Sequence, residues 1–201
     1  MLVKICGIKT LSDAQTATSA GADFLGFNFV PTSRRCISEE TAEDIIAGLG
    51  DKRPKLVGVF QNQPAEFVNA LATKLGFDFI QLHGEESPEY CAEIRTPVIK
   101  AFGLDSDFNT EEVFKRLSGY RVAFYMLDRK GRTGELLNSQ KVAELAKKFP
   151  IILAGGLTPE NVRATITSAG TIQTVDVAVG VERDGEKDAE KIKKFVNEAR
   201  I

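Results

Sequence analysis

Short apolar segments alternate with longer segments of mixed polarity along the whole chain. The short segments are rich in β-branched and aromatic residues, as in 55–60 (KLVGVF) and 122–127 (VAFYML), which predicts strands. In the longer segments apolar residues recur at the spacing of a helix with one buried face, and one such segment follows the last strand. The predicted strands are 2–5, 23–27, 55–60, 77–81, 97–100, 122–127, 150–153 and 175–178.

Capping residues mark where several of the predicted helices begin and end. A hydroxyl side chain followed by an acidic residue or by proline is typical of a helix start. These start signals are Thr10 with Asp13, Ser38 with Glu39 and Glu40, Ser87-Pro88-Glu89, and Thr158-Pro159-Glu160. A glycine that follows a helix commonly adopts the left-handed conformation that closes it. We expect such caps at Gly21, Gly76, Gly119 and Gly170.

The alternation of strand and helix determines the expected fold. Strands joined through helices run parallel, and the eight predicted strand–helix units indicate an α/β protein with a closed (β/α)8 TIM barrel. The alternative is an open doubly wound sheet, but the glycine-rich dinucleotide fingerprint is missing after the first strand. No proline- or serine-rich linker divides the chain, so residues 1–201 are expected to form one barrel domain.

Composition narrows the classes of function. The 26 basic and 28 acidic side chains leave a net charge of −2, which gives no electrostatic basis for binding nucleic acid or an anionic membrane. The apolar stretches are of strand length and residues 1–20 lack the apolar core of a signal peptide, so we expect a cytoplasmic protein. Cys6, Cys36 and Cys91 lack CxxC spacing and accompany a single histidine, which argues against a metal site or a disulfide framework.

Reactive side chains stand where the predicted strands end. Cys6 follows the first predicted strand, His83 follows the fourth, Asp128 follows the sixth, and Asp176 lies in the eighth. In a (β/α)8 barrel the carboxyl ends of the strands form the active face. These four residues are therefore candidates for the chemistry of the protein.

Each candidate has a structural interpretation beside the functional one. Cys6 is either a small buried hydrophobe or a base, whose thiolate Lys4 on the same side of the strand would favour by lowering the thiol pKa. Asp128 is either a carboxyl group kept protonated by apolar surroundings or a paired aspartate with a lowered pKa. His83 could be an acid, a base, a donor or a structural residue. Asp176 could orient a substrate hydroxyl group or pair inside the barrel.

Two loops could bind anions. Gly155 and Gly156 separate the seventh predicted strand from a capped helix start, and Gly180 follows the eighth strand. Barrels commonly bind phosphate at these two loops, where glycine lets the backbone N–H groups approach an anion, although the glycines could also simply form tight turns.

In the loop after the second strand, Arg34 and Arg35 could clamp a substrate carboxylate or be solvated at the surface.

In combination, these stretches are similar to one family over the whole chain and in order: phosphoribosylanthranilate isomerase of tryptophan biosynthesis. They are VKICGIKT (3–10), GADFLGFNF (21–29) with SRR (33–35), VGVFQN (57–62), QLHGEE (81–86), VIKAFG (98–103), MLD (126–128), LAGGLTPENV (153–162) and VDVAVGVE (175–182). The resemblance implies a cofactor-free and metal-free Amadori rearrangement of a phosphorylated aminoaldose to an aminoketose. It also implies a small-molecule substrate as the partner, and a monomer or a homodimer.

The resemblance also implies a role for each candidate residue. Asp128 would be the general acid that protonates the ribose ring oxygen, and Cys6 would be the general base that removes the proton from C2′. Arg35 would hold the anthranilate carboxylate. The remaining substrate contacts would come from Gly155, Gly156, Val179 and Gly180 at the phosphate, and from His83 and Asp176.

Three departures from the family pattern leave other functions open. AVG at 178–180 lacks the two serines that usually precede the glycine, GRTG at 131–134 places Arg132 where glycine is common, and Cys36 replaces a frequent tyrosine. One alternative is the related isomerase of histidine biosynthesis, but that family has an acidic residue in the place of Cys6. Another is a non-catalytic barrel that binds phosphorylated ligands. The joint presence of Cys6, Asp128 and Arg35 favours the isomerase of tryptophan biosynthesis.

Overall fold

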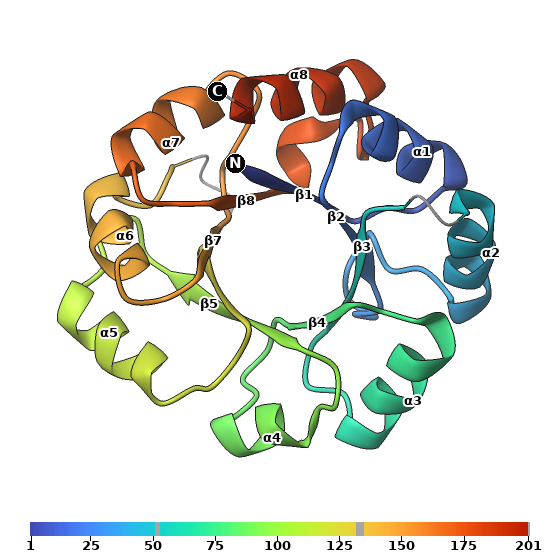
Figure 1. Ribbon diagram of the computed structural model, residues 1–201, viewed down its shortest axis with the longest axis horizontal. Helices are drawn as coiled ribbons and strands as arrows, with labels where there is room; N and C mark the ends of the chain where they lie inside the picture. The colour runs from blue at the N-terminus through green and yellow to red at the C-terminus, as the bar shows by residue number, and fades with distance from the viewer. Residues whose placement is uncertain (51–52, 132–134, 201) are drawn as a thin grey trace.

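Eight parallel strands close into a barrel within the residues that the computed structural model describes, which are 1–50, 53–131 and 135–200. The helices form an outer ring around these strands (Figure 1). The first strand pairs with both the second and the eighth, so the two ends of the sheet meet and complete the barrel. The predicted (β/α)8 barrel is thereby confirmed.

The strands lie close to the predicted segments. They are β1 (Leu2–Cys6), β2 (Phe24–Asn28), β3 (Lys55–Phe60), β4 (Phe79–Leu82), β5 (Val98–Leu104), β6 (Phe124–Arg129), β7 (Ile151–Leu153) and β8 (Thr174–Val177). The helices are α1 (Leu11–Ala20), α2 (Glu39–Leu49), α3 (Ala65–Leu75), α4 (Pro88–Glu93), α5 (Thr110–Ser118), α6 (Ser139–Ala146), α7 (Val162–Ala169) and α8 (Ala189–Ala199). In the described ranges, no helix has both the length and the apolar character that a bilayer span requires.

Apolar side chains fill the lower part of the barrel interior. Near the amino ends of β2, β4 and β6, the rings of Phe24, Phe79 and Phe124 meet edge to face, with centroids 5.7–6.3 Å apart. The same buried cluster continues with Val57, Ile99, Ala101, Met126, Ile152 and Ala154. A second and larger apolar cluster packs the outer faces of the strands against the helices. The interior cluster fills the barrel toward the amino ends of the strands and leaves the carboxyl ends for polar groups.

Most of the predicted helix starts are confirmed. The caps that form hydrogen bonds as expected are Thr10 with Asp13 at α1, Ser38 at α2, and Ser87 with Pro88 at α4. The predicted start at Thr158 is wrong, because α7 begins only at Val162. The backbone N–H of Thr158 donates to Oδ1 of Asn161 (2.8 Å), so residues 158–161 form a turn ahead of the helix.

Two of the four predicted glycine caps are left-handed. Gly21 (φ 92°, ψ 28°) and Gly76 (φ 62°, ψ 41°) close α1 and α3 as expected. The prediction is wrong at Gly119 (φ −75°, ψ −13°), where the chain leaves α5 through a further right-handed turn. At Gly170 the φ angle is positive (58°), but a ψ angle of −40° places the residue outside the left-handed helical region.

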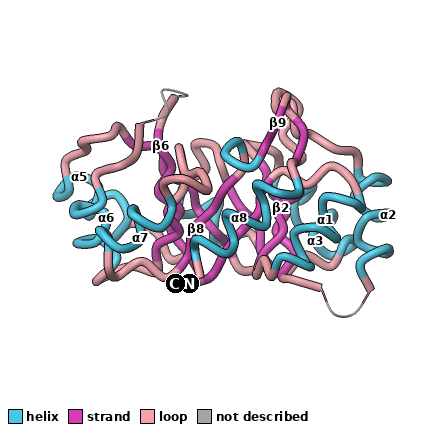
Figure 2. The backbone as a smooth tube through the Cα atoms, turned by 90° about the horizontal axis from the view of Figure 1, so that it is seen from above, coloured by secondary structure: helices cyan, strands magenta, loops and turns pink. Residues whose placement is uncertain are grey.

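An antiparallel hairpin after β8 was not among the predicted elements. The 3₁₀ helix η1 (Val179–Val181) leads into β9 (Glu182–Arg183), which pairs with β10 (Glu186–Lys187) through a tight turn at Asp184 and Gly185. Figure 2 shows β9 on the face of the barrel opposite the two chain termini. The hairpin therefore lies at the carboxyl ends of the strands, where the candidate residues are. Arg132, one of the departures from the family pattern, lies outside the described residues.

Candidate active site

The carboxyl ends of the barrel strands bring several predicted residues into one mouth. Cys6 is the last residue of β1, His83 directly follows β4, Asp128 lies near the end of β6, and Asp176 lies in β8. Because β6 extends to Arg129, Asp128 falls on the same strand face as Phe124 and Met126, which belong to the interior cluster. The alternation of the strands therefore directs the Asp128 side chain toward the barrel mouth.

The thiol of Cys6 is buried at the tip of β1 and forms no disulfide. Its register neighbour on β2 is Gly26, where a Cβ atom would lie 2.8 Å from Cys6 Sγ and 3.1 Å from Lys4 Nζ. Burial raises the pKa of the Cys6 thiol above its usual value, and the positive charge of Lys4 opposes this rise without cancelling it. Lys4 therefore lowers the thiol pKa as expected, but burial has the larger effect and the net shift is upward.

Lys4 and Asp176 form an ion pair inside the barrel. Lys4 is fully buried on β1, and its Nζ lies 2.7 Å from Oδ1 of Asp176 on the adjacent β8. Burial alone would lower the pKa of Lys4, but Asp176 and Cys6 together outweigh this effect and raise the pKa. Of the two interpretations of Asp176, pairing inside the barrel is thus observed. In the described residues no hydrogen bond reaches the second carboxylate oxygen of Asp176, Oδ2.

A chain of side-chain contacts joins β4 to β6. Nε2 of His83 lies 3.1 Å from Oδ2 of Asp128, and Nδ1 of His83 lies 2.9 Å from the amide nitrogen of Gln81. An amide nitrogen can only donate, so Nδ1 of the neutral ring accepts and Nε2 carries the proton that it donates to Asp128. Both ring nitrogens of His83 therefore contact protein groups, and its direct contact with substrate stays a prediction.

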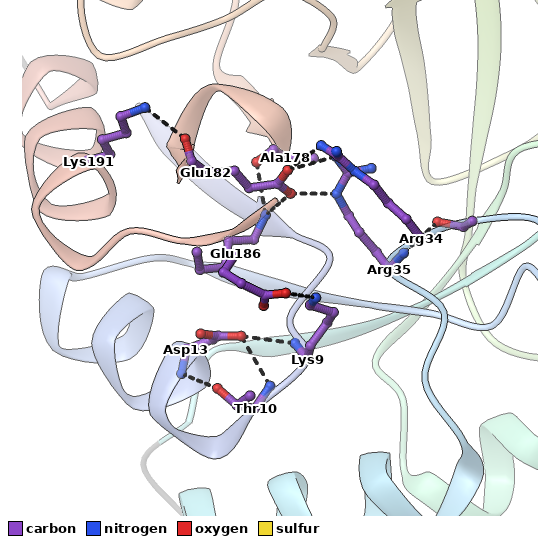
Figure 3. Close-up of polar contacts among 11 residues, drawn as sticks. Lys9, Thr10, Asp13, Arg34, Arg35, Ala178, Glu182, Glu186 and Lys191 are labelled. Carbon is purple, nitrogen blue, oxygen red and sulfur yellow. Dashed lines mark hydrogen bonds and ion pairs between the residues drawn. The ribbon is translucent and has the colours of Figure 1, made fainter. Parts of the chain in front are cut away.

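Arg35 is held by a residue of the hairpin. Its Nε and Nη2 donate to Oε1 and Oε2 of Glu182 at 2.6 and 3.0 Å, which is a bidentate pair (Figure 3). The aliphatic part of Arg35 crosses above Gly7, where a Cβ atom would overlap Cδ of the arginine. Only 13% of the Arg35 side chain is exposed, against 46% for Arg34, so Arg35 is not a solvated surface residue.

The loops after β7 and β8 meet beside the acidic residue of β6. Gly155 and Gly156 both have positive φ angles (84° and 72°), and a Cβ atom on Gly155 would lie 2.7 Å from Oδ1 of Asp128. Gly180 packs so closely on the carbonyl group of Leu157 that a Cβ atom would overlap it. Val179 is 55% exposed at the first position of η1, where backbone N–H groups lack helical partners. Phosphate binding at these loops stays a prediction.

Two buried charged residues of this mouth escaped the sequence analysis. Glu182 and Lys187 face each other across the β9–β10 hairpin, and their side chains are only 4% and 1% exposed. The segment ERDGEK carries Asp-Gly between two short charged runs, and Asp-Gly is a strong signal for a two-residue hairpin turn. The runs lack the alternating apolar residues that identify longer strands. In the part of the chain that the structure describes, no cluster of His, Cys, Asp and Glu has the arrangement of a metal site.

Comparison with known proteins gives relatives that span the whole barrel. The family model of N-(5'phosphoribosyl)anthranilate (PRA) isomerase matches residues 3–198. The N-(5'-phosphoribosyl)anthranilate isomerase of Geobacter metallireducens is 44% identical over 205 residues, which cover 98% of each chain.

Two solved structures are similar to this chain over 100% of its length and 98% of theirs. One shows monomers generated from the dimeric phosphoribosylanthranilate isomerase of Thermotoga maritima, with a TM-score of 0.87 and 37% identity. The other is a phosphoribosyl anthranilate isomerase in complex with reduced 1-(o-carboxyphenylamino)-1-deoxyribulose 5-phosphate, with a TM-score of 0.88 and 37% identity.

Proposed function

The chain belongs to the family of N-(5'-phosphoribosyl)anthranilate isomerases, and we propose that it acts in tryptophan biosynthesis as an aldose–ketose isomerase that uses general acid and base catalysis. Its substrate is N-(5'-phosphoribosyl)anthranilate, and its product is 1-(2-carboxyphenylamino)-1-deoxyribulose 5-phosphate. One observation carries the proposal: the thiol of Cys6 and the carboxyl group of Asp128 lie in the same barrel mouth, with β7 and β8 and their glycine loops between their strands.

The first step opens the ribose ring. Asp128 in its protonated form donates a proton to the ring oxygen, the bond between that oxygen and C1′ breaks, and the anthranilate nitrogen forms a double bond with C1′. His83 Nε2 donates to Oδ2 of Asp128 and fixes the orientation of the carboxyl group, which leaves Oδ1 to carry the transferred proton. The Asp128 side chain is 28% exposed, so solvent can supply a new proton to the carboxylate after each transfer.

The second step moves the double bond. Cys6 as thiolate removes the proton from C2′, the electron pair forms a C1′–C2′ double bond, and the Schiff base becomes an enolamine. Tautomerisation then gives a ketone at C2′ and a CH₂ group at C1′. C2′ is oxidised while C1′ is reduced, so the electrons balance within the substrate and no external oxidant is required. The burial of the thiol supports its role, since a poorly solvated thiolate is a stronger base.

The remaining residues hold the substrate between these two groups. Arg35 binds the anthranilate carboxylate, and backbone N–H groups of the loops after β7 and β8 bind the phosphate. The low exposure of Arg35 and the positive φ angles of Gly155 and Gly156 support these roles. Asp176 accepts a hydrogen bond from a ribose hydroxyl group through Oδ2. We infer a cytoplasmic monomer or homodimer, in line with free thiols and with the dimeric origin of the Thermotoga maritima protein.

The direct test follows consumption of the proposed substrate. Phosphoribosylanthranilate is generated in situ, the purified protein is added, and the loss of substrate fluorescence is recorded. Cys6→Ser and Asp128→Asn should each lose roughly 100-fold to 10,000-fold in kcat, because each removes one proton-transfer group. Cys36→Ser, which changes an exposed thiol, is the matched control and should retain activity. No turnover by the unmodified protein would refute the proposed function, and full activity of Asp128→Asn would refute the acid assignment.

A further inference from the structure

Glu182 is surrounded by cations at the mouth of the barrel. Arg35 contacts both of its carboxylate oxygens, Nη2 of Arg34 lies 2.7 Å from Oε2, and Nζ of Lys187 lies 3.0 Å from Oε1. Nζ of Lys191 also donates to the backbone carbonyl group of Glu182 at 2.7 Å. Figure 3 shows Arg34 and Arg35 converging on Glu182 from the loop after β2. We call Glu182, Arg34, Arg35 and Lys187 the Glu182 cluster.

The Glu182 cluster carries more positive than negative charge. Three cations lie within ion-pair distance of one carboxylate, and the side chains of Glu182, Arg35 and Lys187 are 4%, 13% and 1% exposed. Arg34 is 46% exposed, but Arg35 and Lys187 are poorly solvated cations that repel each other unless anions neutralise them. The cluster is therefore organised to receive a further negative charge, and the carboxylate of the proposed substrate supplies one.

Two cations of the cluster, Arg35 and Lys187, also have a fixed orientation. The guanidinium plane of Arg35 is set by two hydrogen bonds to Glu182, and Gly7 provides the space through which its stem passes. Nζ of Lys187 is fixed by Glu182 and by the carbonyl group of Ala178 at 2.9 Å. The two bonds to Glu182 engage Nε and one N–H of Nη2, so the two N–H groups of Nη1 and the second N–H of Nη2 are left to meet an incoming anion.

We propose that Glu182 is a positioning residue, which rests on the proposed function: it holds Arg35 in the orientation that recognises the substrate carboxylate. Glu182 does not itself meet the substrate, since its two oxygens are occupied by the cluster. The role of the β9–β10 hairpin is then to hold Glu182 beside the loop after β2, which carries Arg35. Arg35 contacts a part of the substrate that does not react, so its orientation should affect substrate binding more than the chemical step.

The experiment compares Glu182→Gln with a matched control on the same hairpin. Glu186→Gln removes a carboxylate that pairs with Lys9 at 2.6 Å and that has no contact with Arg35. Both variants are measured for kcat and KM with phosphoribosylanthranilate. Both are also tested for inhibition by two probes: reduced 1-(o-carboxyphenylamino)-1-deoxyribulose 5-phosphate and its counterpart without the carboxyl group. The same Glu182→Gln change is then made in an Arg35→Ala background.

Glu182→Gln should raise KM and the inhibition constant of the carboxylated probe roughly 10-fold to 100-fold, which is the range of one lost charge-assisted interaction. Its kcat, and the inhibition constant of the probe without a carboxyl group, should change less than about threefold, as should all constants of Glu186→Gln. In the Arg35→Ala background the change should have no further effect, because the residue through which Glu182 acts is gone.

Three results would overturn the positioning role. One is an unchanged or lower KM in Glu182→Gln, which would mean that Glu182 competes with the substrate for Arg35. The second is equal weakening of both probes, which would indicate a general structural defect. The third is a further loss of affinity in the Arg35→Ala background. Absence of turnover by the unmodified protein is a separate result, which refutes the proposed function itself.

Discussion

Replacing Lys4 with methionine tests how the barrel interior supports the proposed base. Lys4→Met removes a fully buried ammonium group and keeps a side chain of similar length. It leaves Asp176, whose side chain is only 10% exposed, without the partner that lies 2.7 Å away. Breaking a buried ion pair by removing one member costs about 3–5 kcal/mol, because the remaining charge stays poorly solvated. We expect a loss of free energy of unfolding in that range.

The same substitution should change the pH dependence of catalysis. Burial raises the pKa of Cys6 above its ordinary value of 9.0, and Lys4 is the strongest of the influences that lower it. A base with a raised pKa is mostly protonated at neutral pH, so kcat/KM of the unmodified protein should still rise with pH beyond pH 9. Without Lys4 this rise should move to higher pH, and each unit of further increase in the pKa removes about tenfold of the thiolate at pH 7.

Urea unfolding at pH 7 and kcat/KM between pH 6 and pH 10 measure the two effects. Lys55→Met is the matched control, because Lys55 also lies in a strand and pairs with an aspartate, Asp78, at 2.9 Å, but is 62% exposed. An exposed pair of this kind contributes about 1 kcal/mol or less. Equal stability losses in Lys4→Met and Lys55→Met would refute the argument from burial. An unshifted pH profile in Lys4→Met would refute the electrostatic coupling between Lys4 and Cys6.

Two further predictions concern acid stability and the glycine loops. Burial opposes ionisation of Glu182, but the cations of the Glu182 cluster lower its pKa from 4.5 to about 2. At about 1.4 kcal/mol per pKa unit, the ionised carboxylate stabilises the fold by roughly 3 kcal/mol above pH 4.5. That contribution should disappear as the pH falls from 4.5 to 2. In urea titrations at several pH values, the free energy of unfolding of Glu182→Gln should therefore fall less between pH 4.5 and pH 2 than that of the unmodified protein. Gly155→Ala should destabilise the protein and raise KM for two reasons. The new Cβ atom would collide with Asp128, and alanine rarely adopts the positive φ angle of this position. Gly76→Ala meets nothing within 4 Å and should cost only about 1–2 kcal/mol at unchanged KM; equal effects of the two substitutions would contradict the argument from contact.

The arrangement of the barrel could be predicted from local patterns, because each strand and each capped helix has a signal within a few residues. The positions of Cys6 and Asp128 follow from the same patterns, since strand ends in such a barrel share one face. The errors at Gly119 and Thr158 arose where a glycine or a hydroxyl group has more than one local use. At Thr158, the side chain of Asn161 accepts from the backbone N–H and delays the helix.

The ion-pair partners of Lys4 and Arg35 could not be predicted, because these partners come from the opposite end of the chain. Lys4 and Asp176 are 172 positions apart, and Arg35 and Glu182 are 147 apart. The direction of the Cys6 pKa depends on the balance between burial and the charge of Lys4, and only the packed structure gives both. Local sequence patterns contain no information on how deeply Cys6 is buried or on how strongly the charge of Lys4 acts on it.

The proposed base and the carboxylate clamp both depend on the seam where β1 and β8 meet. Lys4 and Asp176 pair across this seam in the barrel interior, and Lys9 with Glu186 links the loop after β1 to the hairpin above it. At the opposite end of the barrel, Arg200 after α8 pairs with Asp23 before β2 at 2.9 Å. Cys6 lies beside this seam, so its environment is complete only when the last strand has joined the first. The parts of the site that carry charge should therefore form together with barrel closure, late in folding, because they require contacts between the two ends of the chain.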